Sequence, residues 1–148
     1  SNFPIKVGDV TFNNYNYYAK SDEENDKSLV LAFSNCGKDF VVMGDAPSYI
    51  EKEIIKNTNC IKCDVLKVGH HGSNTSSSID FLNQVKTEIS IISVGKDNSY
   101  GLPKKKIINR LQKINSIVYR TDEDGTIQLI SDGNTNEIVK VDINLDGD

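Results

Sequence analysis

Cysteine, histidine and tryptophan are scarce in this chain of 148 residues, which contains three cysteines, two histidines and no tryptophan. Cys36, Cys60 and Cys63 form an odd and sparse set, so a framework of paired disulfides is excluded. Cys60 and Cys63 have the C-x-x-C spacing of redox and zinc sites, but no second Cys or His pair lies near them in the sequence. We therefore interpret the cysteines as structural residues.

Long apolar runs and excess positive charge are also missing. No stretch approaches the ~18 consecutive apolar residues that indicate a membrane-spanning helix. Lys and Arg number 17 against 21 Asp and Glu, which gives a net charge of −4. Proteins that hold nucleic acid through bulk charge are usually basic, so the composition argues against that class. The length corresponds to about one domain.

Apolar residues recur along the chain with the spacing of strands in some segments and with the spacing of helices in others. A β-rich start is followed by βαβαβα and then by further strands, and this order predicts a single α/β unit. The acidic segment 21–26 has no apolar residue to bury and is expected to be a solvated loop. The expected strands are 28–33, 39–43, 64–68, 89–94, 117–120, 125–130 and 137–141, and the expected helices are 47–55, 79–85 and 103–114.

Three of the expected strands end in polar loops that contain glycine. These loops are 44–45, 69–73 and 95–98. Ligand sites in α/β sheets gather at the carboxyl ends of the strands. The three loops are therefore the first place to look for functional residues.

The two histidines, His70 and His71, are adjacent in the second of these loops. Imidazole is the commonest metal ligand and the natural acid or base near neutral pH. Asp45, one βα step earlier, has two interpretations. Its carboxylate either caps the helix that begins near Pro47 or binds a metal ion together with the histidine pair.

These motifs, in this order, resemble the second half of a metallo-β-lactamase-fold hydrolase. Val41-Val42-Met43-Gly44-Asp45 is followed by Asp-Val-Leu-Lys-Val-Gly-His-His-Gly-Ser at 64–73 and by Thr-Ser-Ser-Ser at 75–78. The similarity is strongest to the extracytoplasmic domain of competence DNA-internalisation proteins and covers roughly residues 5–131. The resemblance implies that residues 1–141 are the C-terminal half of an αββα sandwich, in an extracytoplasmic or secreted protein.

The resemblance also implies which residues carry the chemistry. Asp45 matches the aspartate that bridges two metal ions, and the histidine pair matches the motif that supplies a ligand or an active-site imidazole. Which of the two histidines binds the metal is left open. Zinc or manganese would activate a water molecule for attack on a phosphoester. The candidate catalytic and metal-binding residues are Asp45, His70 and His71, and the candidate substrate-binding residues are Ser73, Asn98 and Tyr100.

The chain departs from the family pattern in two ways. The HxHxDH signature, which supplies most metal ligands, is absent, and the Tyr-Gly-His-Pro motif carries Leu102 in place of histidine. Even one catalytic zinc ion normally has three protein ligands. The sequence therefore predicts a metal-dependent hydrolase, phosphodiesterase-like or nuclease-like, whose N-terminal half is missing here, with weak metal binding and no activity in this chain alone. The alternative is a binding or structural module that kept the fold and lost its metal site.

Two further expectations concern assembly and the chain end. One half of a sandwich leaves a sheet face in water, and burial of apolar surface contributes ~25 cal/mol per Å². We therefore expect this face to bind the missing N-terminal half or a second copy of the chain. Residues 142–148, D-x-N-x-D-G-D, resemble the opening of an EF-hand or dockerin-like calcium loop without its closing carboxylate, and they are expected to be a truncated tail.

Overall fold

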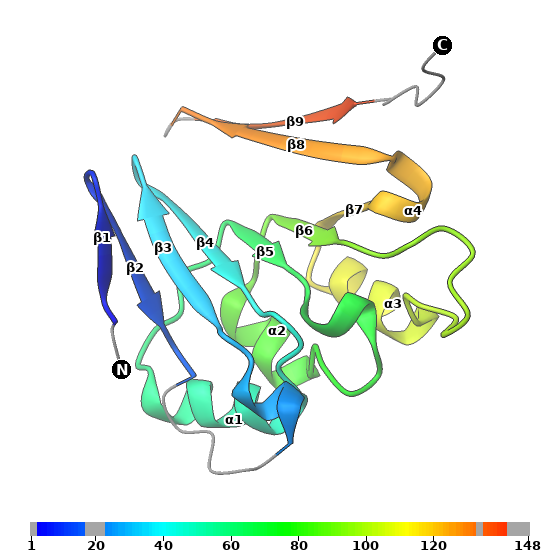
Figure 1. Cartoon of the computed structure of the whole chain (residues 1–148), viewed down its shortest axis with the longest axis horizontal. Coiled ribbons are helices and arrows are strands. Elements are labelled where there is room, and N and C mark those ends of the chain that lie inside the picture. The colour runs from blue at the N-terminus through cyan, green and yellow to red at the C-terminus, as the bar shows by residue number, and fades with distance from the viewer. Residues whose placement is uncertain (1–2, 17–22, 133–134, 142–148) are drawn as a thin grey trace.

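A seven-stranded sheet forms the centre of the computed structural model, which describes residues 3–16, 23–132 and 135–141 (Figure 1). The strands lie side by side in chain order, antiparallel in the first half and parallel from β4 onward. They are β1 (Ile5–Val7), β2 (Val10–Asn14), β3 (Leu31–Asn35), β4 (Lys38–Val42), β5 (Val65–Lys67), β6 (Ile89–Ile92) and β7 (Ile117–Arg120). The prediction of a mixed α/β unit is confirmed.

Three helices connect the parallel strands. They are α1 (Ser48–Asn57), α2 (Ile79–Val85) and α3 (Lys105–Lys113). Because each crossover joins neighbouring parallel strands and such crossovers are right-handed, all three helices lie on the same face of the sheet (Figure 1). The core lies between these two layers, and its buried members include Ala32, Val41, Leu66 and Ile92 from the strands and Ile50, Ile54, Phe81, Leu82, Ile107 and Leu111 from the helices.

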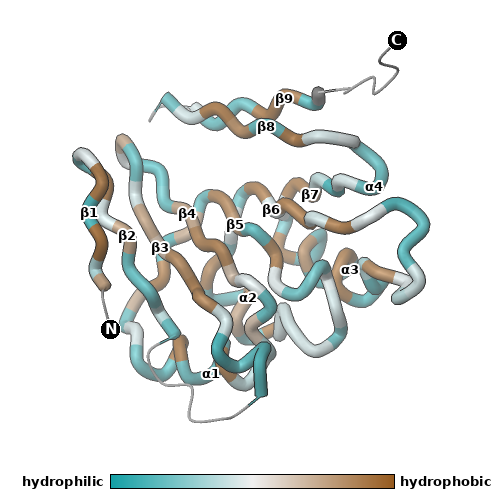
Figure 2. Tube along the Cα trace, viewed as in Figure 1, coloured by the Kyte–Doolittle hydropathy of each residue, from teal (hydrophilic) through white to brown (hydrophobic). Residues whose placement is uncertain are grey.

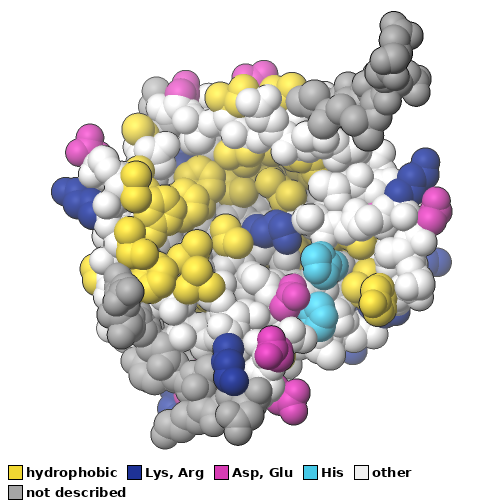
Figure 3. All heavy atoms as spheres, in the orientation of Figure 1, with side chains coloured by type: hydrophobic (Ala, Val, Ile, Leu, Met, Phe, Trp, Pro, Cys, Tyr) yellow, Lys and Arg dark blue, Asp and Glu magenta, His cyan; other side chains and the backbone are white. Residues whose placement is uncertain are grey.

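The opposite face of the sheet is apolar and, in the described part of the chain, carries no helix. Strand register places one residue of each strand in a single row across this face: Ile5, Phe12, Phe33, Phe40, Val65, Ile89 and Ile117. The rings of Phe12 and Phe33 lie 4.7 Å apart, and those of Phe33 and Phe40 lie 4.9 Å apart. Figure 3 shows hydrophobic side chains gathered on this face, and Figure 2 shows hydrophobic residues along its strands. Val65 and Ile89 of the row are buried, whereas Ile5 and Ile117 at its ends are exposed. We call this surface the open face.

A separate hairpin follows the sheet. It consists of β8 (Thr126–Ser131) and β9 (Asn136–Val141), and it comes after the short helix α4 (Thr121–Asp124). Lys140 of the hairpin pairs with Asp124, and its ammonium group lies 5.7 Å from the centre of the Tyr119 ring. These contacts attach the hairpin to the β7 end of the sheet (Figure 1).

The expected elements match the observed ones, with differences at their boundaries. Helix α3 begins at Lys105, two residues after Pro103, which was expected to open it. The expectation of a solvated acidic loop is wrong at Asp26, which is buried in a 3-10 turn at Glu24–Lys27. The Asn16 amide donates hydrogen bonds to the carbonyl oxygens of Asp26 and Ser28, both at 2.7 Å, and so ties this turn to the sheet.

Two further sequence expectations concern the C-terminal tail and membrane-spanning helices. The tail predicted at 142–148 lies outside the described residues. Within the described ranges, the helices are too short or too polar to cross a membrane.

Candidate functional site

Asp45, His70 and His71 meet at one edge of the sheet. They follow β4 and β5, which are adjacent and parallel, so their carboxyl ends lie together. The His70 backbone N–H donates a 2.9 Å hydrogen bond to the Gly44 carbonyl oxygen and joins the two loops. In Figure 3 both histidines (cyan) lie beside acidic side chains (magenta) next to the open face. The structure therefore brings together the three residues that the sequence predicted as a site.

His71 faces Asp45. Its Nε2 lies 3.8 Å from Asp45 Oδ1, and both side chains are close to half exposed. Its Nδ1 lies 2.6 Å from the Ser93 carbonyl oxygen, which follows β6. Because a carbonyl oxygen can only accept a hydrogen bond, Nδ1 carries the proton and the neutral ring keeps the lone pair of Nε2 for a ligand. Metal-binding histidines are typically oriented by such a second hydrogen bond.

His70 faces a different set of groups. Its Nδ1 lies 3.0 Å from the Thr75 hydroxyl, which is itself 3.0 Å from the Ser73 hydroxyl. A hydroxyl can donate or accept, so this contact does not fix the tautomer. The two imidazoles are therefore not equivalent: His71 lies toward Asp45, and His70 lies toward the loop that carries Ser73.

Asp45 does not cap the helix that follows it. Helix α1 has Pro47 as its N-cap residue, without a side-chain hydrogen bond. Instead the Asp45 backbone N–H donates to the Ser28 hydroxyl at 3.2 Å. The capping interpretation is wrong, and the Asp45 carboxylate is left facing His71.

The histidine loop has an unusual backbone. His70 and His71 have φ values of 47° and 52°, and Gly72 has φ of +77°. The left-handed conformation costs roughly 1–2 kcal/mol for each residue that has a side chain. The surrounding contacts maintain it, among them the 2.9 Å hydrogen bond from the Ser76 hydroxyl to the Gly69 carbonyl oxygen. Strain of this kind is concentrated at functional sites.

Glu51 of α1 holds the loop that carries Ser77 and Ser78 through hydrogen bonds of its side chain. Its side chain is buried, and its carboxylate accepts hydrogen bonds from the backbone N–H groups of Ser77 at 2.5 Å and Ser78 at 2.8 Å. Arg110 of α3 donates to the Ser77 carbonyl oxygen at 2.8 Å. Burial raises the pKa of Glu51, whereas the hydrogen bonds and the charge of Arg110 act in the opposite direction. Glu51 has only a weak sequence signal, its position three residues before Ile54 on the apolar side of α1.

Asn98 and Tyr100 line a cavity of about 210 Å³ beside His71. The Asn98 amide donates to the carbonyl oxygens of Gly95 at 3.0 Å and Leu102 at 2.7 Å, and its oxygen accepts the Leu102 N–H at 3.0 Å. Asn98 therefore shapes the loop, and Tyr100 is the exposed side chain of the cavity. Ser73, the third predicted substrate-binding residue, does not line this cavity and contacts Thr75 instead.

The metal ligands within the described ranges are few. No group of three or more His, Cys, Asp or Glu side chains there could hold a metal ion. The 3.8 Å between His71 Nε2 and Asp45 Oδ1 is too long for a hydrogen bond and slightly longer than the roughly 3.3–3.5 Å that separates two ligands of a tetrahedral zinc ion. A small movement of either side chain would therefore be needed before the two could share one metal ion. Next to it on β5, burial lowers the pKa of Lys67, while the charge of Asp45 opposes that shift.

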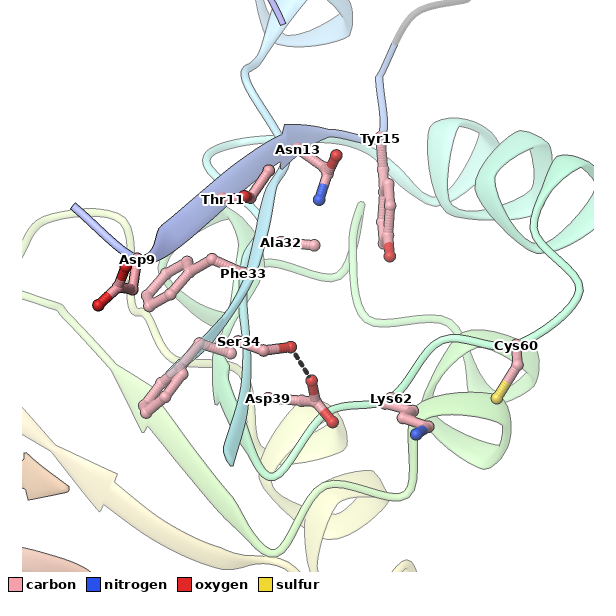
Figure 4. A pocket seen from close by; sticks show the side chains of 11 residues that line it. Asp9, Thr11, Asn13, Tyr15, Ala32, Phe33, Ser34, Asp39, Cys60 and Lys62 are labelled. Carbon is pink, nitrogen blue, oxygen red and sulfur yellow. Dashed lines mark hydrogen bonds between the residues drawn. The ribbon is translucent and has the colours of Figure 1, made fainter. Parts of the chain in front are cut away.

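A larger cavity of about 420 Å³ is lined by residues along β2, β3 and the start of β4 and by the segment before β5 (Figure 4). Its lining carries charges of both signs, from Asp9, Asp39 and Lys62, and burial beside Asp39 raises the pKa of Tyr15. Cys60 also lines it.

Cys63, by contrast, is buried in the core, where burial raises the pKa of its thiol to about 12. A thiol with that pKa stays protonated and unreactive. Cys60 is exposed, so the C-x-x-C pair is divided between the surface and the core, as a structural role for Cys63 predicts.

The architecture and the strand-end residues define an α/β domain with a polar site beside an apolar sheet face that, in the described part of the chain, carries no helix. No known family model matches the chain. The chain is homologous to a segment of competence-related proteins.

It is 38% identical over 131 residues to ComE operon protein 3 of Bacillus subtilis, a match that covers 84% of this chain and 17% of the relative. It is 37% identical over 110 residues to competence protein ComA of Neisseria gonorrhoeae, covering 74% of this chain and 16% of the relative. It is 33% identical over 106 residues to recombination protein 2 of Haemophilus influenzae, covering 72% and 13%. The chain thus spans less than a fifth of the length of these curated relatives. The predicted resemblance to competence proteins is confirmed, and the metallo-β-lactamase fold stays a prediction.

Proposed function

We propose that this chain is the Asp45- and His71-bearing part of a longer metal-dependent phosphodiesterase that acts on nucleic acid outside the cytoplasm. The observation that carries the proposal is the orientation of His71. Its Nδ1 is held by the Ser93 carbonyl oxygen, and its Nε2 faces the Asp45 carboxylate. The competence-related names of the homologues support nucleic acid as the substrate class.

The residues of this chain would hold and orient the reacting groups. Bound zinc or manganese would polarise the phosphoester and activate a water molecule. The Asp45 carboxylate supplies negative charge for the cation, and the Ser93 carbonyl oxygen keeps His71 in the tautomer that can bind it. His70 is held by Thr75 in the same loop. The remaining ligands would come from the missing N-terminal half of the domain.

Metal binding by the isolated chain is expected to be weak and to depend on His71. We expect zinc or manganese titration calorimetry to show substoichiometric binding that is lost in His71→Ala and in Asp45→Ala. His70→Ala is the matched control, since its ring faces Thr75, and it should retain binding. A tight site for two metal ions in this chain, or equal losses in both histidine variants, would contradict this assignment.

Activity is tested in the longer protein with its upstream half restored. A generic phosphodiester should be cleaved with zinc or manganese, and Asp45→Ala should reduce the rate by at least about 100-fold, as for the loss of a group that positions a metal. If no cleavage occurs and Asp45→Ala changes nothing, the hydrolase proposal fails. The non-catalytic module, motivated by Leu102, would then be the better description.

The open face provides the second part of the proposal, a partner surface. Ile5, Val7 and Ile117 on the outer strands of this face are 42%, 62% and 58% exposed. Val65 and Ile89, on β5 and β6 between these edges, are buried at 5% and 8% exposure, so the exposed apolar residues lie at the two edges of the face. Exposed apolar surface of this kind marks an interaction site. We propose that the missing N-terminal half covers it in the longer protein, and that in the isolated chain a second copy does.

Self-association should therefore depend on the open face. Sedimentation of the 148-residue chain is expected to show concentration-dependent dimers, and Ile5→Lys combined with Val7→Lys should shift the chain to monomer. Ile79→Lys is the control, because Ile79 is similarly exposed at 39% but lies on α2, on the helical side. A stable wild-type monomer at high concentration would show that the face needs no cover.

A further inference from the structure

The cavity beside His71 combines apolar walls with an exposed aromatic ring. Val94 and Leu102 form part of its lining, and Tyr100 at its edge is 79% exposed. Among the lining residues that the structure describes, none is acidic. Leu102 stands where the resembled family has histidine, so this wall can no longer bind a metal ion but can contact an apolar surface. The cavity therefore suits a flat, weakly polar group that belongs to an anionic molecule.

The loop that presents Tyr100 is fixed before any ligand arrives. The Asn98 side chain makes three hydrogen bonds to the backbone of Gly95 and Leu102. The Lys104 ammonium group donates to the Tyr100 carbonyl oxygen at 2.8 Å, and the Lys104 backbone N–H donates to the Gly72 carbonyl oxygen at 3.0 Å. Rigid presentation of an aromatic ring lowers the ordering cost of binding. It also links the cavity directly to the histidine loop.

We propose that this cavity is a subsite for one nucleobase of the substrate, which stacks on Tyr100 while the adjoining phosphate reaches His71 and Asp45. The proposal rests on the phosphodiesterase function proposed above and adds the recognition of an unpaired nucleotide. The volume of about 210 Å³ lies below the roughly 300–1,000 Å³ of pockets for drug-sized ligands, so it fits one base rather than a whole nucleotide. Lys104 places a positive charge at the backbone of Tyr100, where it can attract the backbone of the nucleic acid.

Stacking on Tyr100 requires a base that is free on one face. A base inside a duplex is stacked and paired, so it must be extruded or belong to a single strand. Base–aromatic stacking tolerates any sequence because every base has a π-face. The subsite therefore selects unpaired nucleotides without selecting a sequence.

The test measures binding of the 148-residue chain to a fluorescent single-stranded oligonucleotide of about ten nucleotides, by anisotropy with chelator present. Tyr100→Ala should weaken binding roughly 5- to 100-fold, the range of one stacked base. Tyr100→Phe, which keeps the ring, should restore the affinity. Tyr49→Ala removes another exposed tyrosine, on α1, and should bind like the wild type.

Two further variants locate the base. Gly95 lines the cavity, and a Cβ there meets no atom within 4 Å, so Gly95→Leu adds bulk at the cavity and should weaken binding like Tyr100→Ala. A series of oligonucleotides with a single abasic position should reveal one position that matters most in the wild type. That position should lose its effect in Tyr100→Ala.

The possible results distinguish a failure of the nucleobase subsite from a failure of the proposed phosphodiesterase function. Equal affinity of wild type and Tyr100→Ala for intact and abasic oligonucleotides overturns the subsite, even if the longer protein cleaves phosphodiesters. Base-dependent binding through Tyr100 without metal-dependent cleavage in the longer protein supports the subsite and overturns the hydrolase. No binding of any oligonucleotide, or preferential binding of apolar peptides, overturns the subsite.

Discussion

Gly72→Ala is expected to destabilise the fold by about 2–5 kcal/mol, combining the cost of a left-handed alanine with that of overpacking. Gly72 has φ of +77°, and a Cβ there would lie 2.6 Å from the Cβ of Pro103. Pro103 is buried in front of α3, so neither residue can move without disturbing the histidine loop or the core. Urea unfolding at equilibrium, followed by circular dichroism, measures the effect.

Gly95→Ala is the matched control for this loss. Gly95 begins the next of the three strand-end loops, its φ is not positive, and an added Cβ there meets nothing within 4 Å. The change in the free energy of unfolding should stay within about 1 kcal/mol and can even be stabilising, because alanine restricts the unfolded chain. Equal destabilisation by the two substitutions would show that the close approach of Gly72 to Pro103 is not what constrains this position.

Glu51→Ala is expected to cost about 2–4 kcal/mol and to release the loop beside His70. The substitution leaves the N–H groups of Ser77 and Ser78 without their acceptor. An unsatisfied buried donor costs about 1–3 kcal/mol, and we expect that cost at buried Ser77 and a smaller one at partly buried Ser78. Urea unfolding measures the loss. Ser78, the N-cap of α2, would also be less well positioned, so α2 should fray first in hydrogen exchange.

Glu51→Gln separates the charge of this residue from its hydrogen bonds. Burial raises the pKa of Glu51 above its ordinary value of 4.5, so the folded state binds the proton more tightly than the unfolded state. This stabilising contribution is complete below pH 4.5 and is lost as the pH rises through the folded pKa. The free energy of unfolding of the wild type should therefore fall relative to that of Glu51→Gln as the pH rises from 4.5 upward. Parallel stability curves for the two proteins would contradict a raised pKa.

The elements and the location of the site could be predicted because both follow from local patterns. Apolar periodicity indicated the strands and helices, and the rule that ligands bind at the carboxyl ends of parallel strands brought Asp45 and the histidines together. The different orientations of His70 and His71 could not be predicted in this way. They depend on the carbonyl oxygen of Ser93, 22 residues from His71, and on a left-handed backbone that no side-chain pattern reveals.

Buried polar residues were the other limit of prediction. Asp26 and Glu51 are charged residues, a type that normally lies at the surface, and only tertiary contacts account for their burial. A carboxylate is buried when backbone N–H groups of another segment need an acceptor, as those of Ser77 and Ser78 do. This need arises from the left-handed turn at Ser77, so it becomes visible only when the loop has been built.

The order of the strands has a consequence for how the chain folds. From β1 to β7 each strand pairs with the one that precedes it in the sequence, so no pairing has to wait for a distant segment. The β1–β2 and β3–β4 pairings need only a tight turn, whereas each parallel pairing from β4 to β7 must wait for the helix of its crossover and is expected to form more slowly. During synthesis the sheet can therefore grow from the N-terminus one strand at a time, and each new strand covers the edge left by the last. The hairpin β8–β9 is then added to a sheet that is already complete.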